Sequence, residues 1–221
     1  QGLRRIQGAG LRLGVRLILV RHGQSEGNAG GVRQGHLDFG LTALGRRQAQ
    51  ATAARLAREP VVRVLSSPLG RALETAEAIA APHGTTIEQE HGLLEYAIGD
   101  IAGMTSAQIA ERYPDISAAY RRGERPVFPG EEGREVFNAR IRAVMDAWNA
   151  DPKVTVAVAH GGVIAAICYL VLQMDHARPG IFQVANCSVT ELMLDRAGRL
   201  LLRRHNDVCH LAGIVTQEGP D

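Results

Sequence analysis

Two arginines and two histidines lie at the ends of apolar stretches in this sequence, where they could hold and transfer a phosphoryl group. Arg21 and His22 directly follow the apolar run in "LILVRHGQSEGN", and His160 directly follows the run in "KVTVAVAH". Arg71 comes shortly after the serines that end "VVRVLSS". Two guanidinium groups can grip two edges of a tetrahedral phosphoryl group, and a neutral imidazole can attack phosphorus as a nucleophile. The four side chains therefore predict a phosphoryl-transfer site, provided that the fold brings them together.

A carboxylate that could complete such a site lies in "LLEYAIGDIAGMT". Phosphoryl transfer needs an acid that protonates the leaving oxygen, and Glu95 of this stretch follows a predicted strand closely. The glycines after it would let the chain bend over the site. Of the two histidines, His22 is the better candidate for the nucleophile, because Gly23 beside it would leave room for in-line approach. His160 would then stabilise the equatorial phosphoryl oxygens.

The spacing of apolar residues predicts the elements that position these side chains. Short, unalternating apolar runs are typical of strands buried on both faces of a parallel sheet. They occupy residues 15–20, 61–67, 85–90 and 153–160. Helical spacing covers residues 43–58, 69–81, 134–150 and 163–173, and residues 188–206 read as a hairpin. Thr42 is the predicted N-cap of the first helix.

Strands that alternate with helices predict an α/β fold, with a three-layer, doubly wound and mostly parallel sheet. Ligands of such sheets bind outside the carboxyl ends of the strands. Arg21–His22, Ser66–Ser67 and His160–Gly161 all fall at predicted carboxyl ends, so we expect them to converge.

One segment interrupts the alternation of strands and helices. Residues 92–133 are rich in Gly, Pro and charged residues, with short helices expected at 106–112 and 116–121. We interpret the segment as a helical cap inserted into a single domain that spans residues 15–215. Residues 1–14 are rich in Gly and Arg, lack the apolar core of a signal peptide, and read as a disordered arm, a cloning remnant or a misjudged start.

Charge and composition argue against several classes of protein. The net charge of +2 lacks the strong basic excess of a nucleic-acid binder. No apolar run approaches the roughly 18 residues of a membrane span, and no carboxylate cluster suggests a metal site. The three cysteines are widely spaced and include no CxxC pair, which suits a reducing cytoplasm. We therefore expect a cytoplasmic protein whose partner is a small phosphorylated metabolite.

Five motifs in order resemble those of the histidine phosphatase superfamily, also called phosphoglycerate mutase-like. They are "LVRHGQSEGN", "SSPLGRALETA", "LLEYAIGDIAGMT", "PGEEGREVFNARI" and "VAHGGVI", and the resemblance covers roughly residues 16–211. It implies an enzyme that needs neither a metal nor another cofactor. It also leaves open a homodimer, since oligomers are common in this family.

The resemblance also implies a role for each site residue. His22 would carry the phosphoryl group as a phosphohistidine, and Glu95 would be the proton donor and later the base for water. The phosphate pocket would be completed by Arg21, Arg71 and His160. Substrate contacts would come from Asn28, from Gln34 near the pocket mouth, and from the backbone N–H of Gly161.

The activity itself is open between hydrolysis and isomerisation. Mutases of this family usually follow the acid with a basic and aromatic stretch, whereas Glu95 precedes the more apolar Tyr96, Ala97 and Ile98. This resembles the broad-specificity phosphatase branch, so we expect a metal-independent phosphomonoester hydrolase. The alternatives are a cofactor-dependent phosphoglycerate mutase and, less favoured because the catalytic set is intact, a non-catalytic protein that binds phosphorylated ligands.

Overall fold

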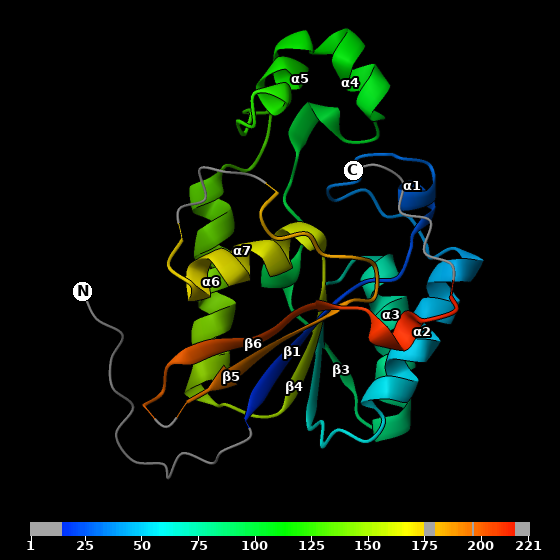
Figure 1. Cartoon of the computed structure of the whole chain (residues 1–221), viewed down its shortest axis with the longest axis vertical. Coiled ribbons are helices and arrows are strands. Elements are labelled where there is room, and N and C mark those ends of the chain that lie inside the picture. The colour runs from blue at the N-terminus through cyan, green and yellow to red at the C-terminus, as the bar shows by residue number, and fades with distance from the viewer. Residues whose placement is uncertain (1–14, 175–179, 196, 215–221) are drawn as a thin grey trace.

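A six-stranded sheet forms the centre of the computed structural model, which describes residues 15–174, 180–195 and 197–214 (Figure 1). The strand order is β3-β2-β4-β1-β5-β6. The strands are β1 (Arg16–Arg21), β2 (Arg63–Ser66), β3 (Ile87–Gln89), β4 (Thr155–Ala159), β5 (Val189–Leu194) and β6 (Leu200–Asp207). The first four run parallel, while β5 and β6 are antiparallel to their neighbours. The predicted mostly parallel α/β sheet is confirmed.

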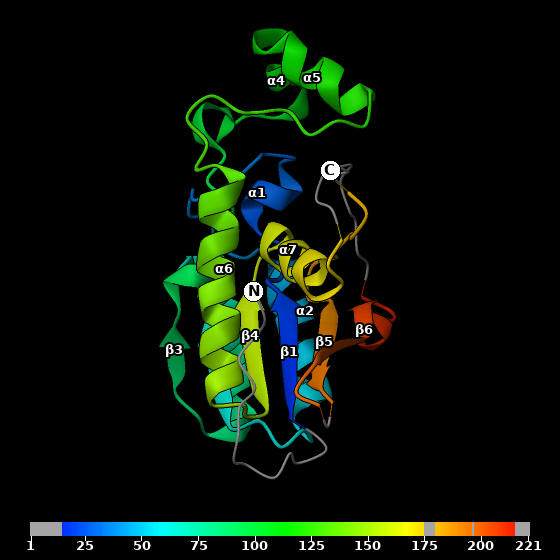
Figure 2. The ribbon, with the colours of Figure 1, turned by 90° about the vertical axis from the view of Figure 1, so that its left-hand side faces the viewer.

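Helices cover both faces of the sheet, which makes three layers (Figure 2). One face carries α2 (Ala43–Leu56) and α3 (Gly70–Ala80), and the other carries α6 (Arg134–Ala150) and α7 (Gly161–Val171). Alternate residues of β1 enter the two cores. Leu17 and Leu19 pack toward α6 and α7, whereas Ile18 and Val20 pack toward α2 and α3. Burial on both faces explains why the strand sequence is apolar without alternation.

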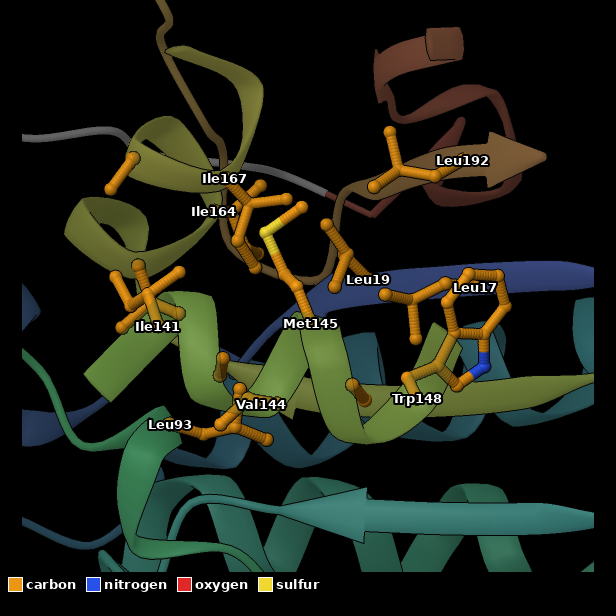
Figure 3. Packing of buried hydrophobic residues seen from close by; sticks show 14 of the residues in the cluster. Leu17, Leu19, Leu93, Ile141, Val144, Met145, Trp148, Ile164, Ile167 and Leu192 are labelled. Carbon is orange, nitrogen blue, oxygen red and sulfur yellow. The ribbon is translucent and has the colours of Figure 1, made fainter. Parts of the chain in front are cut away.

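The core under α6 anchors the strand that leads to His160. Figure 3 shows Trp148, Met145 and Ile141 of α6 packing against residues of β1 and α7. The indole N–H of Trp148 donates to the Lys153 carbonyl, at 3.1 Å, and lies 3.2 Å from Thr155 Oγ1. A buried indole usually needs such a partner. These contacts fix the start of β4 against α6.

The segment between β3 and α6 forms a cap beyond the carboxyl ends of the strands (Figures 1 and 2). It contains α4 (Ser106–Arg112) and α5 (Pro114–Arg121), close to the predicted helices. Its own small core consists of Ile101, Ile109, Ile116 and Phe128. The cap is joined to the loop after β1 by two backbone hydrogen bonds, Arg33 N to Met104 O and Gly103 N to Arg33 O. The exact bounds of the cap, 92–133, and of the single domain, 15–215, stay predictions.

Some helix starts differ from the prediction. Gly161 and Gly162 form the first turn of α7 instead of preceding it, and α3 begins at Gly70 with Leu69 as N-cap. The short helix α1 (Glu26–Ala29) was not predicted; a capping box between Ser25 and Asn28 forms it. Thr42 caps α2 as expected. The remaining short helices are η1 (Ala81–His83), η2 (His91–Leu93), η3 (Gly99–Ile101) and η4 (Cys209–Leu211).

Some sequence predictions fall outside the described ranges. They are the disordered arm or remnant at residues 1–14, the first residue of the predicted hairpin turn, 196, and the last residue of the predicted domain, 215. Across the ranges that are described, no helix is both long enough and apolar enough to cross a membrane.

Candidate active site

The predicted convergence of strand ends is present. In the register of β4, Arg21 of β1 lies beside Ala159 and Ser66 of β2 lies beside Val158. The residues that follow these strands are therefore neighbours at one edge of the sheet. The rings of His22 and His160 are tilted by 60°, with centroids 5.1 Å apart.

The hydrogen bond of His22 defines its tautomer. His22 is 3% exposed, and its Nδ1 lies 2.7 Å from the carbonyl oxygen of Gly23. A carbonyl oxygen only accepts, so Nδ1 must carry the proton. Burial lowers the pKa of His22 well below 6.5, and the charges of Arg21 and Arg71 lower it further. The ring is thus neutral at pH 7, with the lone pair on Nε2 available for attack.

Gly23 lies where the loop after β1 comes very close to α2. A Cβ at Gly23 would lie 2.5 Å from the carbonyl oxygen of Gly45, in the first turn of α2. Its N–H donates to Thr75 Oγ1 at 3.0 Å. Gly23 is therefore required by the close approach of the loop to α2. The expectation that it also leaves room for in-line approach stays a prediction.

His160 is held by the serine at the end of β2. His160 is fully buried, and its Nε2 lies 2.8 Å from Ser67 Oγ. Ser67 Oγ also accepts a long hydrogen bond from the N–H of Leu69, which favours donation of its own proton to Nε2. Nδ1 would then carry the remaining proton. Burial and the neighbouring His22 and arginines lower the pKa of His160 well below 6.5.

The two arginines are tied to backbone carbonyls of other segments. Arg71 is 1% exposed and donates to the carbonyl oxygens of Leu37 and Gly35, at 2.7 and 2.8 Å. Arg21 donates to the carbonyl of Val184. Burial lowers the pKa of Arg71 from 12.5, opposed by Glu95, and a guanidinium with this starting value stays charged at neutral pH.

Three buried nitrogen atoms at this point have no hydrogen-bond partner within the described part of the chain. They are Nε of Arg21, Nε of Arg71 and Nδ1 of His160. Leaving a buried donor unpaired costs about 1–3 kcal/mol, so native proteins seldom do it without a reason. Unpaired donors with two guanidinium charges beside them make a site for an anion with several acceptor oxygens.

The carboxylate of Glu95 lies at the first turn of α7, next to this anion site. Its Oε2 accepts from the N–H of Gly162 at 3.1 Å, and its Oε1 accepts from the N–H of Tyr96 at 2.8 Å. Gly162 is two residues from His160 in the chain, and Glu95 lies close enough to Arg71 to raise the pKa of its guanidinium. The structure therefore brings the predicted acid to the same strand-end cluster.

Gly162 gives the Glu95 carboxylate its room. A Cβ at Gly162 would lie 2.4 Å from Glu95 Oε1, so Gly162→Ala must displace the carboxylate. Alanine is the better helix former by about 1 kcal/mol, and the obstructing atom belongs to a flexible side chain. We expect Gly162→Ala to retain its melting temperature within a few degrees while hydrolysis of alkyl phosphates falls about tenfold. Unchanged turnover, measured beside thermal melts, would show that the carboxylate does not need this position.

The three residues predicted to contact the substrate differ in what surrounds them. Asn28 closes the capping box of α1, and its Oδ1 lies 3.3 Å from Nδ2 of Asn186, which also donates to the His22 carbonyl. Gln34 Oε1 accepts from Ser25 Oγ at 2.8 Å. A Cβ at Gly161 would lie 3.7 Å from Arg21 Nε. Of the three, Gly161 is the one placed directly against the anion site.

Two arginines of the cap are paired with carboxylates of the cap. Arg125 forms a two-pronged pair with Glu131, and Arg122 pairs with Glu124. Arg125 also lies over the ring of Tyr96, 5.0 Å from its centroid. These two arginines therefore serve the cap itself.

Sequence reasoning missed several residues that surround the site. His36 had no expected role, yet its Nε2 donates to the Glu95 carbonyl at 2.7 Å. Arg140 reaches the same carbonyl from α6, at 2.8 Å. Both hydrogen bonds run from a side chain to a backbone carbonyl of a distant residue, and no local pattern in the sequence predicts such a pairing.

The buried neutral histidines make stability depend on pH. Below pH 6.5 the unfolded chain protonates His22 and His160, whereas the folded chain does not until the pH reaches their much lower folded pKa values. Folding free energy should therefore be lost as pH falls below 6.5, by up to about 1.4 kcal/mol per pH unit for each histidine. Urea denaturation between pH 7.5 and 5.5 measures the slope.

A double variant isolates this contribution, because His205 and His210 also have lowered pKa values. Replacing His22 and His160 together by asparagine should flatten the pH dependence by up to about 2.7 kcal/mol per pH unit. An unchanged slope in the double variant would contradict the neutral, buried state of the pair.

Fold and site together define an α/β protein with a candidate anion site at the carboxyl ends of parallel strands. A model of the histidine phosphatase superfamily (branch 1) matches residues 17–207, and the chain belongs to this superfamily. Among the described residues, no group of three or more His, Cys, Asp or Glu side chains could hold a metal ion.

Several named relatives of the chain are phosphatases, and others are named as phosphoglycerate mutases or mutase-like proteins. Glucosyl-3-phosphoglycerate phosphatase of Mycolicibacterium vanbaalenii is 38% identical over 69% of this chain and 72% of that protein. A putative phosphoserine phosphatase 2 of Hydrogenobacter thermophilus is 32% identical over 88% of this chain and 97% of the relative. A solved structure of mycobacterial glucosyl-3-phosphoglycerate phosphatase with VO3 matches with a TM-score of 0.78 and 33% identity, covering 87% of this chain and 99% of that one. The predicted family, fold and enzyme class, a phosphatase, are confirmed.

Proposed function

We propose that the protein hydrolyses phosphate monoesters of small metabolites through a phosphohistidine on His22. The observation that carries this is the neutral His22 ring, with its proton on the Gly23 side and Nε2 free, beside three buried nitrogens that lack partners. Arg21, Arg71 and His160 would hold the phosphoryl oxygens, and the N–H of Gly161 would add a backbone donor at the N-terminus of α7.

In the first step the Nε2 lone pair of His22 attacks phosphorus and the bond from phosphorus to the ester oxygen breaks. The leaving oxygen takes the proton of the Glu95 carboxyl group. Positive charge develops on the imidazole, and the bond from Nδ1–H to the Gly23 carbonyl stabilises it. Pocket donors that have no partner beforehand become satisfied by phosphoryl oxygens.

In the second step a water molecule replaces the alcohol. The Glu95 carboxylate takes a proton from water while the water oxygen attacks phosphorus. The bond from phosphorus to Nε2 breaks, and its electron pair returns to His22. Inorganic phosphate leaves, and Glu95 is again protonated for the next substrate.

Substrates of the named relatives suggest which esters to test. Glucosyl-3-phosphoglycerate and phosphoserine both carry a carboxylate two carbons from the phosphorylated carbon, so a small carboxylated phosphate monoester is the favoured substrate. Asn28 and Gln34 are proposed to line the approach to the pocket. The small-metabolite chemistry fits a cytoplasmic enzyme, and a homodimer is the proposed assembly.

A phosphate-release assay tests this function. Purified protein with excess EDTA would be given p-nitrophenyl phosphate, phosphoserine, 3-phosphoglycerate, glucosyl-3-phosphoglycerate and sugar phosphates. The same samples would be tested for conversion of 3- to 2-phosphoglycerate with 2,3-bisphosphoglycerate added. Release without isomerisation supports the proposal, whereas isomerisation well above hydrolysis would make the protein a mutase. Loss of release with EDTA would contradict metal independence.

A further inference from the structure

A single arginine of α6 fastens the stretch of backbone that carries Glu95. Arg140 Nη1 donates to the carbonyl oxygens of Gly92 and Leu94, at 2.8 and 2.6 Å, and Nη2 donates to the Glu95 carbonyl at 2.8 Å. One guanidinium thus binds three carbonyls within four residues. Such a concentration of charge-assisted hydrogen bonds on one short segment fixes the path of its backbone.

The guanidinium is itself held in one orientation. Glu132 accepts from Arg140 Nε at 3.1 Å and from Nη2 at 2.8 Å. The ring of Phe137 lies 4.6 Å from the guanidinium carbon, and the ring of Tyr96 packs edge-on against Phe137. The side chains of Arg140 and Glu132 are 20% and 13% exposed, so the pair is largely removed from solvent and weakly screened.

Glu132 also holds the residues on the other side of Glu95. Its Oε1 accepts from the N–H of Ala97 at 2.8 Å, and its own N–H donates to the Ala97 carbonyl at 3.0 Å. The hydroxyl of Tyr96 accepts from the N–H of Gly133 at 3.1 Å. The backbone is therefore fixed immediately before and after Glu95.

We propose that Arg140, oriented by Glu132, is a positioning residue that places the Glu95 carboxyl group for proton transfer to the leaving oxygen. The proposal rests on the proposed function, in which Glu95 is the proton donor. The Glu95 side chain adds its own contacts with Gly162 and Tyr96, but these fix the carboxylate only if the backbone beneath it stays in place. A misplacement of about 1 Å in a catalytic group can cost on the order of 10²-fold in rate.

The chemistry of the leaving group separates positioning from general structural support. p-Nitrophenolate is a stable anion that leaves without a proton, whereas phenolate from phenyl phosphate is more basic and gains from an acid in the transition state. The two esters differ only by the para nitro group. A misplaced acid therefore slows phenyl phosphate selectively, while a general loss of structure slows both.

The experiment compares both esters in variants of the full chain. Arg140→Lys keeps the positive charge, but the lysine lacks the two separated Nη atoms that bind the three carbonyls. Glu132→Gln removes the carboxylate that orients Arg140. Arg142→Lys on the exposed side of α6 is the matched control. Melting temperatures are measured for all variants, so that kcat/KM is compared only where the protein is folded. Glu95→Gln provides the reference for a lost acid.

We expect Arg140→Lys and Glu132→Gln to lower kcat/KM about tenfold for phenyl phosphate and by less than about twofold for p-nitrophenyl phosphate. The ratio kcat/KM reports the first step, whereas the second step, in which Glu95 acts as the base, is the same for both esters. Glu95→Gln should show the same selectivity at on the order of 10²-fold. An equal fall for both esters in the Arg140 and Glu132 variants, or no fall, would overturn the positioning role while Glu95 remained the acid. Absence of selectivity in Glu95→Gln would instead remove Glu95 as the proton donor, and the proposed function with it.

Discussion

His22→Ala is expected to abolish phosphate release, with a fall in kcat/KM on the order of 10⁴-fold or more, because the covalent intermediate forms on this ring. The neutral state of His22 supplies a free Nε2 lone pair at pH 7, and no other side chain at the strand ends has this arrangement. His160 is bound through Nε2 to Ser67 and its Nδ1 is placed as a donor, so it cannot take over the attack without giving up its hydrogen bond. The measurement is phosphate release from p-nitrophenyl phosphate, which needs no acid and therefore isolates the nucleophile.

Trapping of the intermediate gives a second readout for His22. Rapid acid-free quenching after mixing with labelled substrate should leave the label on the native protein in an alkali-stable, acid-labile bond, as a phosphoramidate requires, and the label should be absent from His22→Ala. His91→Ala, an exposed histidine of η2, is the control and should label and turn over normally. A His22→Ala protein that still turned over more than a few per cent as fast as the native one would exclude His22 as the nucleophile.

The strand ends could be predicted from sequence because their pattern has a direct physical cause. β1 is apolar at every position since Leu17 and Leu19 face one core and Ile18 and Val20 face the other. Once the strands are identified as parallel, their carboxyl ends must meet at one edge. That step alone brings Arg21 and His22 beside His160.

Side-chain contacts with the backbone of distant segments could not be predicted in the same way. Arg140 lies 45 positions from Glu95 in the chain, and a carbonyl acceptor has no residue type that would mark it. The close approach that requires Gly23 is of the same kind, because the atom nearest to an added Cβ is the Gly45 carbonyl oxygen of another element. Such contacts depend on how the cap and helices dock, which the local spacing of residues does not encode.

Arg71→Lys is expected to reduce kcat/KM by roughly 10²–10³-fold, corresponding to the loss of about 2.7–4 kcal/mol of transition-state stabilisation for one preorganised donor. The guanidinium of Arg71 spans two carbonyls, of Gly35 and Leu37, and still has Nε unpartnered toward the anion site. A lysine ammonium is a single point of charge and cannot bind both carbonyls and a phosphoryl oxygen at once. The charge is retained, so a large effect would show that geometry, and not charge alone, is what the site requires.

The same substitution should lower stability by about 1–3 kcal/mol, because at least one buried carbonyl loses its partner. Gly35 and Leu37 flank His36, which donates to the Glu95 carbonyl, so the acid would be disturbed as well and phenyl phosphate should suffer more than p-nitrophenyl phosphate. Inhibition by vanadate and by inorganic phosphate should weaken in parallel with kcat/KM. Arg63→Lys is the control, because it alters a partly exposed pair with Glu88 at the edge of the sheet. It should leave kcat/KM, inhibition by vanadate and inhibition by inorganic phosphate unchanged. Anion inhibition that is unaffected by Arg71→Lys would place the phosphoryl group away from Arg71 and contradict the pocket described above.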